Sequence, residues 1–76
     1  MPTVLHQNGF RFYFWSNEGN EPAHIHVTKA DGIAKYWLDP KIKCHSTKGF
    51  TAREIRQIEE IINENYVLLI NEWNEK

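Results

Sequence analysis

The sequence predicts an α+β fold in which a four- or five-stranded antiparallel β-meander packs on one or two C-terminal α-helices. Three observations predict this fold. Alternating apolar residues broken by turn signals occupy about residues 3–45, an apolar stripe with helical spacing follows, and 76 residues suffice for one core only. We therefore expect residues 1–76 to form a single domain, with strands in about 3–45 and a helical region in about 51–75.

The first two strands are predicted from a hairpin signal. A short strand over residues 3–6 is followed by Asn8-Gly9, the strongest short-range signal for a hairpin. The second strand then covers residues 10–15, where apolar and amphipathic residues alternate. This alternation predicts that Phe10, Phe12 and Phe14 face the core, and that Arg11, Tyr13 and Trp15 face the other way.

The next strands follow a polar loop over residues 16–23. A third strand is expected over residues 24–29, with Ile25 and Val27 facing the core. Asp31-Gly32 predicts a second hairpin turn, and a fourth strand over residues 33–38 ends at Asp39-Pro40, because proline cannot extend a ladder of hydrogen bonds. A short edge strand is expected over residues 41–45, and the turn-prone residues 44–49 then separate the β-rich half from the helical half.

The helical region begins with a clear capping signal. Thr51 as N-cap and Glu54 three residues later form a capping box, and Phe50 with Ile55 forms a hydrophobic staple. Asn63 and Asn65 interrupt the pattern, and asparagine favours caps over helix interiors, so we expect a kink or a break there. The apolar stripe expected to cover the sheet consists of Ile55, Ile58, Ile62, Tyr66, Leu69 and Trp73.

The face of the sheet opposite the core carries an unusual set of side chains. Period-two alternation places His24, His26 and Thr28 of the third strand there, beside the outward residues of the second strand. Lys35 and Trp37 join them if Tyr36 and Leu38 point inward. Such a face is either the ordinary solvated side of an antiparallel sheet or a surface that binds a ligand, a partner or a second copy.

One interpretation of the histidines is a metal site. His24 and His26, two residues apart on a strand, project to the same side and could supply two nitrogen ligands to zinc. Two ligands do not make a site, and no spacing in the sequence selects the others. The candidates for the remaining ligands are Glu18, Glu21, Asp39, Cys44 and His45.

A second interpretation is metal-independent, ribonuclease-like chemistry on a phosphodiester. His24 or His26 would move protons, and Arg11 or Lys35 would hold the phosphate. The aromatic residues Tyr13, Trp15 and Trp37 would stack on the bases of RNA.

A third interpretation needs no chemistry. The histidines would hydrogen-bond the loop over residues 16–21, and Glu21 is restricted to extended conformations by the proline that follows it. Trp15 and Trp37 would then anchor a homodimer or a heteromeric partner, as large aromatic residues often do. Whether the chain is an enzyme therefore stays open at this point.

Composition limits the partners and the compartment. The formal net charge of −1 gives no global field for nucleic acid, so any anion site must be local. The single cysteine, Cys44, excludes an internal disulfide and predicts a reducing, cytoplasmic compartment. The longest apolar run, residues 67–70, is far shorter than the roughly 20 residues that span a bilayer, so no membrane partner is expected.

Several segments together resemble the domain of unknown function 4160 family of small bacterial proteins. The most specific is Glu21-Pro22-Ala23-His24-Ile25-His26-Val27, which matches the family's Pro-Pro-His-x-His-Val type of motif except that Ala23 replaces the second proline. The others are Met1-Pro2-Thr3-Val4, residues 10–14, residues 34–38, Gly49-Phe50 and Glu72-Trp73-Asn74.

The resemblance covers essentially the whole chain and implies a genetic context rather than an activity. Members are often encoded beside another small protein, an arrangement similar to toxin–antitoxin modules. It therefore implies a toxin–antitoxin-like component with a cognate small protein as partner, and it assigns no catalytic residue. Cofactors are expected to be absent, with zinc at His24 and His26 as the open alternative.

Overall fold

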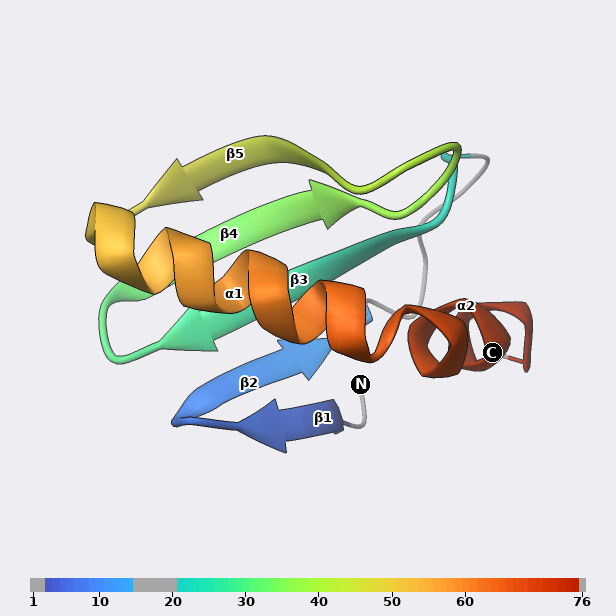
Figure 1. Ribbon diagram of the computed structural model, residues 1–76, viewed down its shortest axis with the longest axis horizontal. Coiled ribbons are helices and arrows are strands. Elements are labelled where there is room, and N and C mark those ends of the chain that lie inside the picture. The colour runs from blue at the N-terminus through green and yellow to red at the C-terminus, as the bar shows by residue number, and fades with distance from the viewer. Residues whose placement is uncertain (1–2, 15–20, 76) are drawn as a thin grey trace.

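The computed structural model describes residues 3–14 and 21–75. Five antiparallel strands form one sheet in the order β1-β2-β3-β4-β5, and two helices follow (Figure 1). The strands are β1 (Thr3–Gln7), β2 (Phe10–Tyr13), β3 (His24–Lys29), β4 (Gly32–Trp37) and β5 (Lys43–Lys48), and the helices are α1 (Ala52–Glu64) and α2 (Tyr66–Glu75). The predicted α+β fold, with a β-meander before C-terminal helices, is confirmed.

The first hairpin forms as its sequence predicts. Gln7 pairs with Phe10, so Asn8 and Gly9 are the two loop residues. Both have positive φ, 55° and 83°, as a two-residue hairpin turn requires. The turn therefore sets the register of β1 against β2 from Leu5 to Phe12, and an irregularity between Thr3 and Leu5 shifts it at the start of β1.

The second hairpin turns one residue earlier than predicted. Lys29 pairs with Gly32, and Ala30 rather than Gly32 has the positive φ, 51°. Gly32 is instead the first residue of β4, and a Cβ added there would overlap Cε1 of Phe50. Glycine is thus required at this position because the Phe50 ring lies against it, and not because the turn needs its conformational freedom.

The last strand is the main difference from the sequence prediction. The edge strand covers Lys43–Lys48 rather than residues 41–45, so most of the predicted turn-prone stretch 44–49 is strand. Pairing with β4 overrides the weak local preference of Ser46 and its neighbours, and β5 ends at Lys48, just before Gly49, whose φ is 83°. The second strand is also shorter than predicted, because β2 ends at Tyr13 and Trp15 lies outside the described residues.

The helical half follows its capping signals. The Thr51 hydroxyl accepts a hydrogen bond from the Glu54 backbone N–H at 3.1 Å, and the Glu54 carboxylate accepts one from the Thr51 N–H at 2.9 Å. The predicted break occurs at Asn65, which caps α1 and whose side-chain amide donates to the Ile61 carbonyl at 2.8 Å. The Tyr66 hydroxyl then ties the start of α2 to the Leu38 carbonyl at 2.6 Å.

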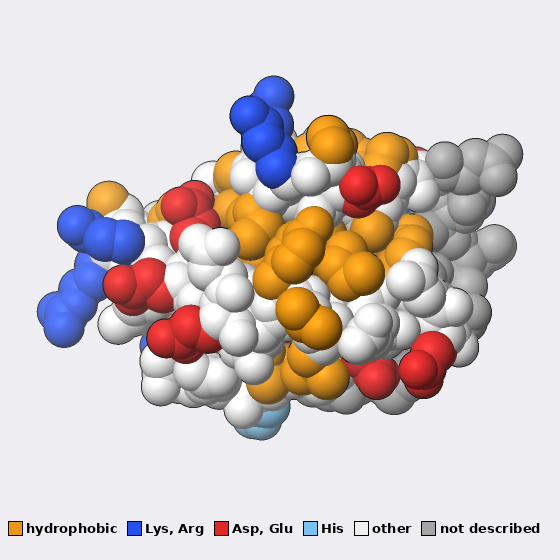
Figure 2. All heavy atoms as spheres, turned by 45° about the vertical axis from the view of Figure 1, so that its right-hand side comes forward, with side chains coloured by type: hydrophobic (Ala, Val, Ile, Leu, Met, Phe, Trp, Pro, Cys, Tyr) orange, Lys and Arg blue, Asp and Glu red, His pale blue; other side chains and the backbone are white. Residues whose placement is uncertain are grey.

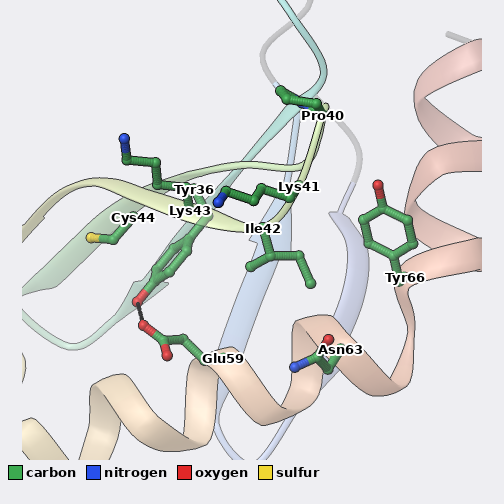
Figure 3. Close-up of a pocket in the computed structure, with 9 residues that line it drawn as sticks. All are labelled: Tyr36, Pro40, Lys41, Ile42, Lys43, Cys44, Glu59, Asn63 and Tyr66. Carbon is green, nitrogen blue, oxygen red and sulfur yellow. Dashed lines mark hydrogen bonds between the residues drawn. The ribbon is translucent and has the colours of Figure 1, made fainter.

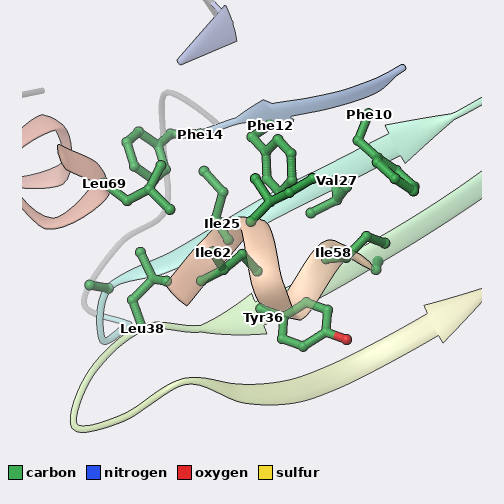
Figure 4. Close-up of a cluster of buried hydrophobic side chains, with 13 residues drawn as sticks. Phe10, Phe12, Phe14, Ile25, Val27, Tyr36, Leu38, Ile58, Ile62 and Leu69 are labelled. Atoms are coloured by element: carbon green, nitrogen blue, oxygen red, sulfur yellow. The ribbon is translucent and has the colours of Figure 1, made fainter. Parts of the chain in front are cut away.

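The core lies between the inner face of the sheet and α1, with Leu69 of α2 at one end (Figure 4). The predicted inward residues of the strands are buried, and the whole predicted apolar stripe is buried or partly buried. Ile61, which the predicted stripe omitted, is also buried. The strand residues of this core are Phe10, Phe12, Ile25, Val27, Ala34 and Tyr36, with Phe14 and Leu38 just beyond the strand ends.

The second helix leaves apolar side chains at the surface. Val67 is 71% exposed and Leu68 is 42% exposed. Figure 2, which turns the α2 side of the molecule forward, shows hydrophobic side chains gathered across the middle of this face. Neither helix in the described part of the chain is long and apolar enough to cross a membrane.

Candidate functional site

The face of the sheet turned away from α1, called the outer face below, consists of three cross-strand rows. The first row contains two cations, Arg11 and Lys48, and each of the other two rows contains one lysine. The rows are His6, Arg11, Thr28, Ile33 and Lys48; then Tyr13, His26, Lys35 and Ser46; then His24, Trp37 and Lys43.

Tyr13 connects a cation to an imidazole on this face. Its ring stacks on that of His26, with centroids 5.5 Å apart and an interplanar angle of 24°. The Cζ of Arg11 lies 4.7 Å from the centroid of the Tyr13 ring, a cation–π distance. Arg11 is exposed, and Tyr13 and His26 are half-buried, so these three groups form a platform that solvent reaches.

His24 is enclosed, whereas the alternation of the strand alone predicts it on an open face. It is fully buried, and the rings of His26, Trp37 and Trp73 lie around it with centroids 5.3, 5.5 and 5.0 Å away. Trp73 comes from α2 and also packs edge-on against Phe14, so the second helix closes this end of the sheet. That contact joins residues far apart in the sequence, which strand periodicity cannot reveal.

The hydrogen bond of His24 gives it a positioning role. Its Nδ1 lies 2.8 Å from the Pro22 carbonyl oxygen, and a carbonyl only accepts, so Nδ1 carries the proton. Its Nε2 lies 3.7 Å from Oε1 of Glu21. The ring therefore holds the Pro22 carbonyl just before β3, one residue beyond the 16–21 loop named by the interpretation without chemistry, and Glu21 lies next to this contact.

Lys35 and Trp37 continue the outer face toward β5. The Lys35 ammonium lies 2.9 Å from Oε1 of Glu21 and 4.8 Å from the centroid of the Trp37 ring. His45 packs edge-on against the same ring at 5.3 Å. His45 reaches this position because β5 has an irregularity there: Tyr36 pairs with Cys44 but Lys35 pairs with Ser46.

The metal interpretation gains no third ligand from the described residues. The rings of His24 and His26 are close but meet edge to face, and no group of three or more His, Cys, Asp or Glu side chains suited to a metal ion occurs among residues 3–14 and 21–75. Cys44 is exposed and pairs with the inward residue Tyr36, on the opposite side of the sheet. Glu18 lies outside the described residues.

A second feature lies on the other side of the sheet and was not predicted. Between β5 and α1 is a cleft of about 680 Å³, lined by Tyr36, Pro40, Lys41, Ile42, Lys43, Cys44, Glu59, Asn63 and Tyr66. Figure 3 shows Tyr36 of β4 and Glu59 of α1 reaching toward each other across it, and the Tyr36 hydroxyl donates to the Glu59 carboxylate at 3.0 Å. Burial, followed by this hydrogen bond, raises the pKa of the Tyr36 phenol well above its usual value.

Comparison with known proteins identifies the family. The model of a domain of unknown function, DUF4160, matches residues 9–74. The chain belongs to the DUF4160 family. No curated protein and no solved structure matches the chain. The resemblance inferred from the sequence is therefore confirmed, and family membership assigns no activity to the outer face.

The sequence located most of the candidate site of this DUF4160 chain but not all of it. Arg11, Tyr13, His26, Lys35 and Trp37 do lie together on the outer face, with His24 buried beneath the same ring cluster. Trp15, the remaining predicted site residue, lies outside the described residues.

Two further histidines belong to the outer face of this DUF4160 domain. The Asn8-Gly9 hairpin already implies that His6 pairs with Arg11, so His6 was within reach of sequence reasoning. The position of His45 was not within reach of sequence reasoning, because the irregularity in β5 decides which way its side chain points. With His24 and His26, all four histidines of the chain are thus associated with this face.

Proposed function

We propose that the outer face of this DUF4160 domain binds single-stranded RNA. The observation that carries the proposal is the series of ring and cation contacts across four strands, from Arg11 through Tyr13 and His26, then through the buried His24, to Trp37 and His45. Sheets that present aromatic rings beside cations are a recurrent way to bind unpaired bases, because every base has a face that can stack.

The distribution of charge supports an anionic ligand despite the net charge of −1. Six of the ten acidic residues lie in the helices: four in α1 and two in α2. On the outer face the described rows hold Arg11, Lys35, Lys43 and Lys48 and no acidic residue, and Glu21 beside them pairs with Lys35. The sheet therefore separates a cationic side from an acidic helical side, and a local field can exist without a global one.

We propose that this RNA-binding chain is a toxin–antitoxin-like component with a cognate small protein as partner. If RNA is also cleaved, His26 is the acid or base that the geometry favours, because it is half-buried while His24 is fully buried. Arg11 or Lys35 would hold the phosphate, and Arg11 is exposed with its guanidinium over the Tyr13 ring.

Fluorescence anisotropy with a labelled single-stranded oligonucleotide of RNA tests the binding. Tyr13→Ala should weaken binding by about 5- to 150-fold, the range expected for the loss of one stacked base. Arg11→Ala should lower the slope of log K against log salt by about 0.7, the value for one phosphate contact on a single strand. Arg56→Ala, which removes an exposed cation of α1, is the matched control and should change neither quantity.

Two results would overturn the RNA proposal. One is the absence of RNA binding by the wild-type chain, and the other is an identical salt slope for Arg11→Ala and Arg56→Ala. Induced expression of the chain alone and then with its genomic neighbour, scored for growth and RNA integrity, tests the toxin–antitoxin role. His26→Gln should abolish any arrest while leaving the circular dichroism spectrum unchanged.

A second candidate function, a non-enzymatic protein-interaction module, is favoured by one observation on α2. Val67 and Leu68 are adjacent, apolar and exposed at a helix surface, where water contact is unfavourable. Light scattering of the wild type and of Val67→Glu distinguishes the candidates. A stable oligomer that Val67→Glu dissociates would place the interaction on α2, and a monomer in both cases would argue against self-association there.

A further inference from the structure

We propose that the open edge of β5 binds an extended acidic peptide segment of another protein, which adds to the sheet as a sixth strand. In the described part of the chain β5 has a strand neighbour on one side only, and all six of its residues are exposed. An edge of this kind presents backbone N–H and C=O groups that an extended segment can pair with. This interaction uses the backbone edge of β5 rather than the rings of the outer face, although the two surfaces share Lys43 and Lys48.

The way α1 crosses the sheet leaves β5 open. Figure 1 shows the helix starting beside the end of β5 and running diagonally toward β2, so that the two elements diverge. The cleft of about 680 Å³ lies where they separate, and Tyr36, Ile42 and Tyr66 provide apolar wall (Figure 3). A segment beside β5 would therefore have its inward side chains over this cleft, where Tyr36, Ile42 and Tyr66 can pack against apolar groups.

The positive charge around β5 favours an acidic partner segment. From Pro40 to Arg53 the sequence contains three lysines, one histidine and one arginine, and no acidic residue. Lys43 and Lys48 pair with Trp37 and Ile33, so both belong to the outer side of the strand, at its two ends. A docked segment with acidic residues on its outward side would place them next to these lysines, and cross-strand pairs of opposite charge stabilise a sheet.

The same charges argue against a second copy of this chain as the occupant. If two β5 strands paired antiparallel about a twofold axis with full overlap, Lys43 of each copy would face Lys48 of the other at both ends. Like charges directly opposite on neighbouring strands are destabilising. The β5 edge thus disfavours pairing with β5 of a second copy and favours a segment that alternates acidic and apolar residues.

The test uses the full chain and three fluorescent peptides of about eight residues, a typical strand length. The first alternates glutamate with isoleucine, the second alternates lysine with isoleucine, and the third is the acidic peptide with alternate backbone nitrogens methylated. We expect binding of the first only, because methylation removes the backbone donors that strand addition needs. Amide NMR signals of Lys43–Lys48 should shift on binding.

Protein variants separate this edge from the rest of the surface. Lys43→Glu and Lys48→Glu should each weaken binding of the acidic peptide about tenfold, whereas Arg56→Glu on α1 serves as the matched charge reversal and should have a much smaller effect. Tyr13→Ala should leave peptide binding unchanged, so failure of the RNA proposal and failure of this one are distinguishable. Circular dichroism confirms that each variant is folded.

Three outcomes would overturn the inference. The methylated peptide binding as tightly as its parent would show that backbone pairing is not involved. Equal binding of the acidic and basic peptides would remove the argument from charge. A wild-type homodimer that buries β5 and excludes the acidic peptide would show that a second copy occupies the edge.

Discussion

The hydrogen bond from Tyr36 to Glu59 joins the sheet to α1 at the cleft, and its contribution to stability should depend on pH. Burial of the phenol, and then the hydrogen bond to Glu59, raises the Tyr36 pKa above the value of about 10 that tyrosine has in the unfolded chain. As pH rises, the unfolded chain therefore releases this proton before the folded chain does. The stability that Tyr36 contributes is fully present below about pH 10 and is lost progressively above it.

The size of the effect follows from proton linkage. Above about pH 10 the free energy of unfolding should fall by about 1.4 kcal/mol per pH unit because of this one group. Tyr36→Phe removes that slope. At neutral pH the variant should be less stable by about 1 kcal/mol, the usual net value of one hydrogen bond. The gap between wild type and variant should therefore close as the solution becomes alkaline.

Urea denaturation at neutral pH and in steps above about pH 10 measures both quantities. Glu59→Gln is an informative companion, since it keeps an acceptor for the hydroxyl but removes the negative charge. Because burial is the largest cause of the raised pKa, Glu59→Gln should keep most of the alkaline slope. The reasoning would be refuted by a constant difference in unfolding free energy between wild type and Tyr36→Phe across the alkaline range.

Three further predictions concern the fold and the metal interpretation. Thr51→Ala removes the N-cap of α1 and should lower the free energy of unfolding by about 1 kcal/mol in urea, while Thr51→Ser should restore most of it. Gly32→Ala places a methyl group in the space of the Phe50 ring and should cost about 1–3 kcal/mol, an effect that Phe50→Leu in the same chain should reduce. Treatment with EDTA should leave the Tm of the untagged chain unchanged, and a fall of several degrees would restore the metal interpretation.

The features that could be predicted from the sequence are the turns and helix ends, which interactions between neighbouring residues decide. Asn8-Gly9 sets its hairpin because few residues adopt positive φ at low cost, and Thr51 with Glu54 starts α1 because they satisfy backbone groups within one turn. The break at Asn65 is also local, since its side chain caps the preceding turn.

What could not be predicted depends on contacts between distant segments. The strand Lys43–Lys48 forms because β4 offers it an edge, although most of its residues belong to a stretch that by itself favours a turn. His24 follows the predicted alternation along β3 and is nevertheless buried, because Trp73 of α2 lies against it. The cleft depends on the angle at which α1 crosses the sheet, and no residue pattern in α1 specifies that angle.

The two proposed binding surfaces meet at Lys43 and Lys48, which stand at the β5 end of rows that also contain Trp37 and Arg11. An acidic segment docked along β5 would neutralise these lysines and lower the positive potential of the outer face. RNA should then bind more weakly when the edge is occupied, and by thermodynamic linkage the segment should bind more weakly to the RNA complex by the same factor. Titrating RNA at several concentrations of the acidic peptide measures both couplings. If each ligand weakens the binding of the other by the same factor, a partner on the β5 edge controls RNA binding to the outer face. If the two ligands bind independently, Lys43 and Lys48 contribute to binding at the edge alone.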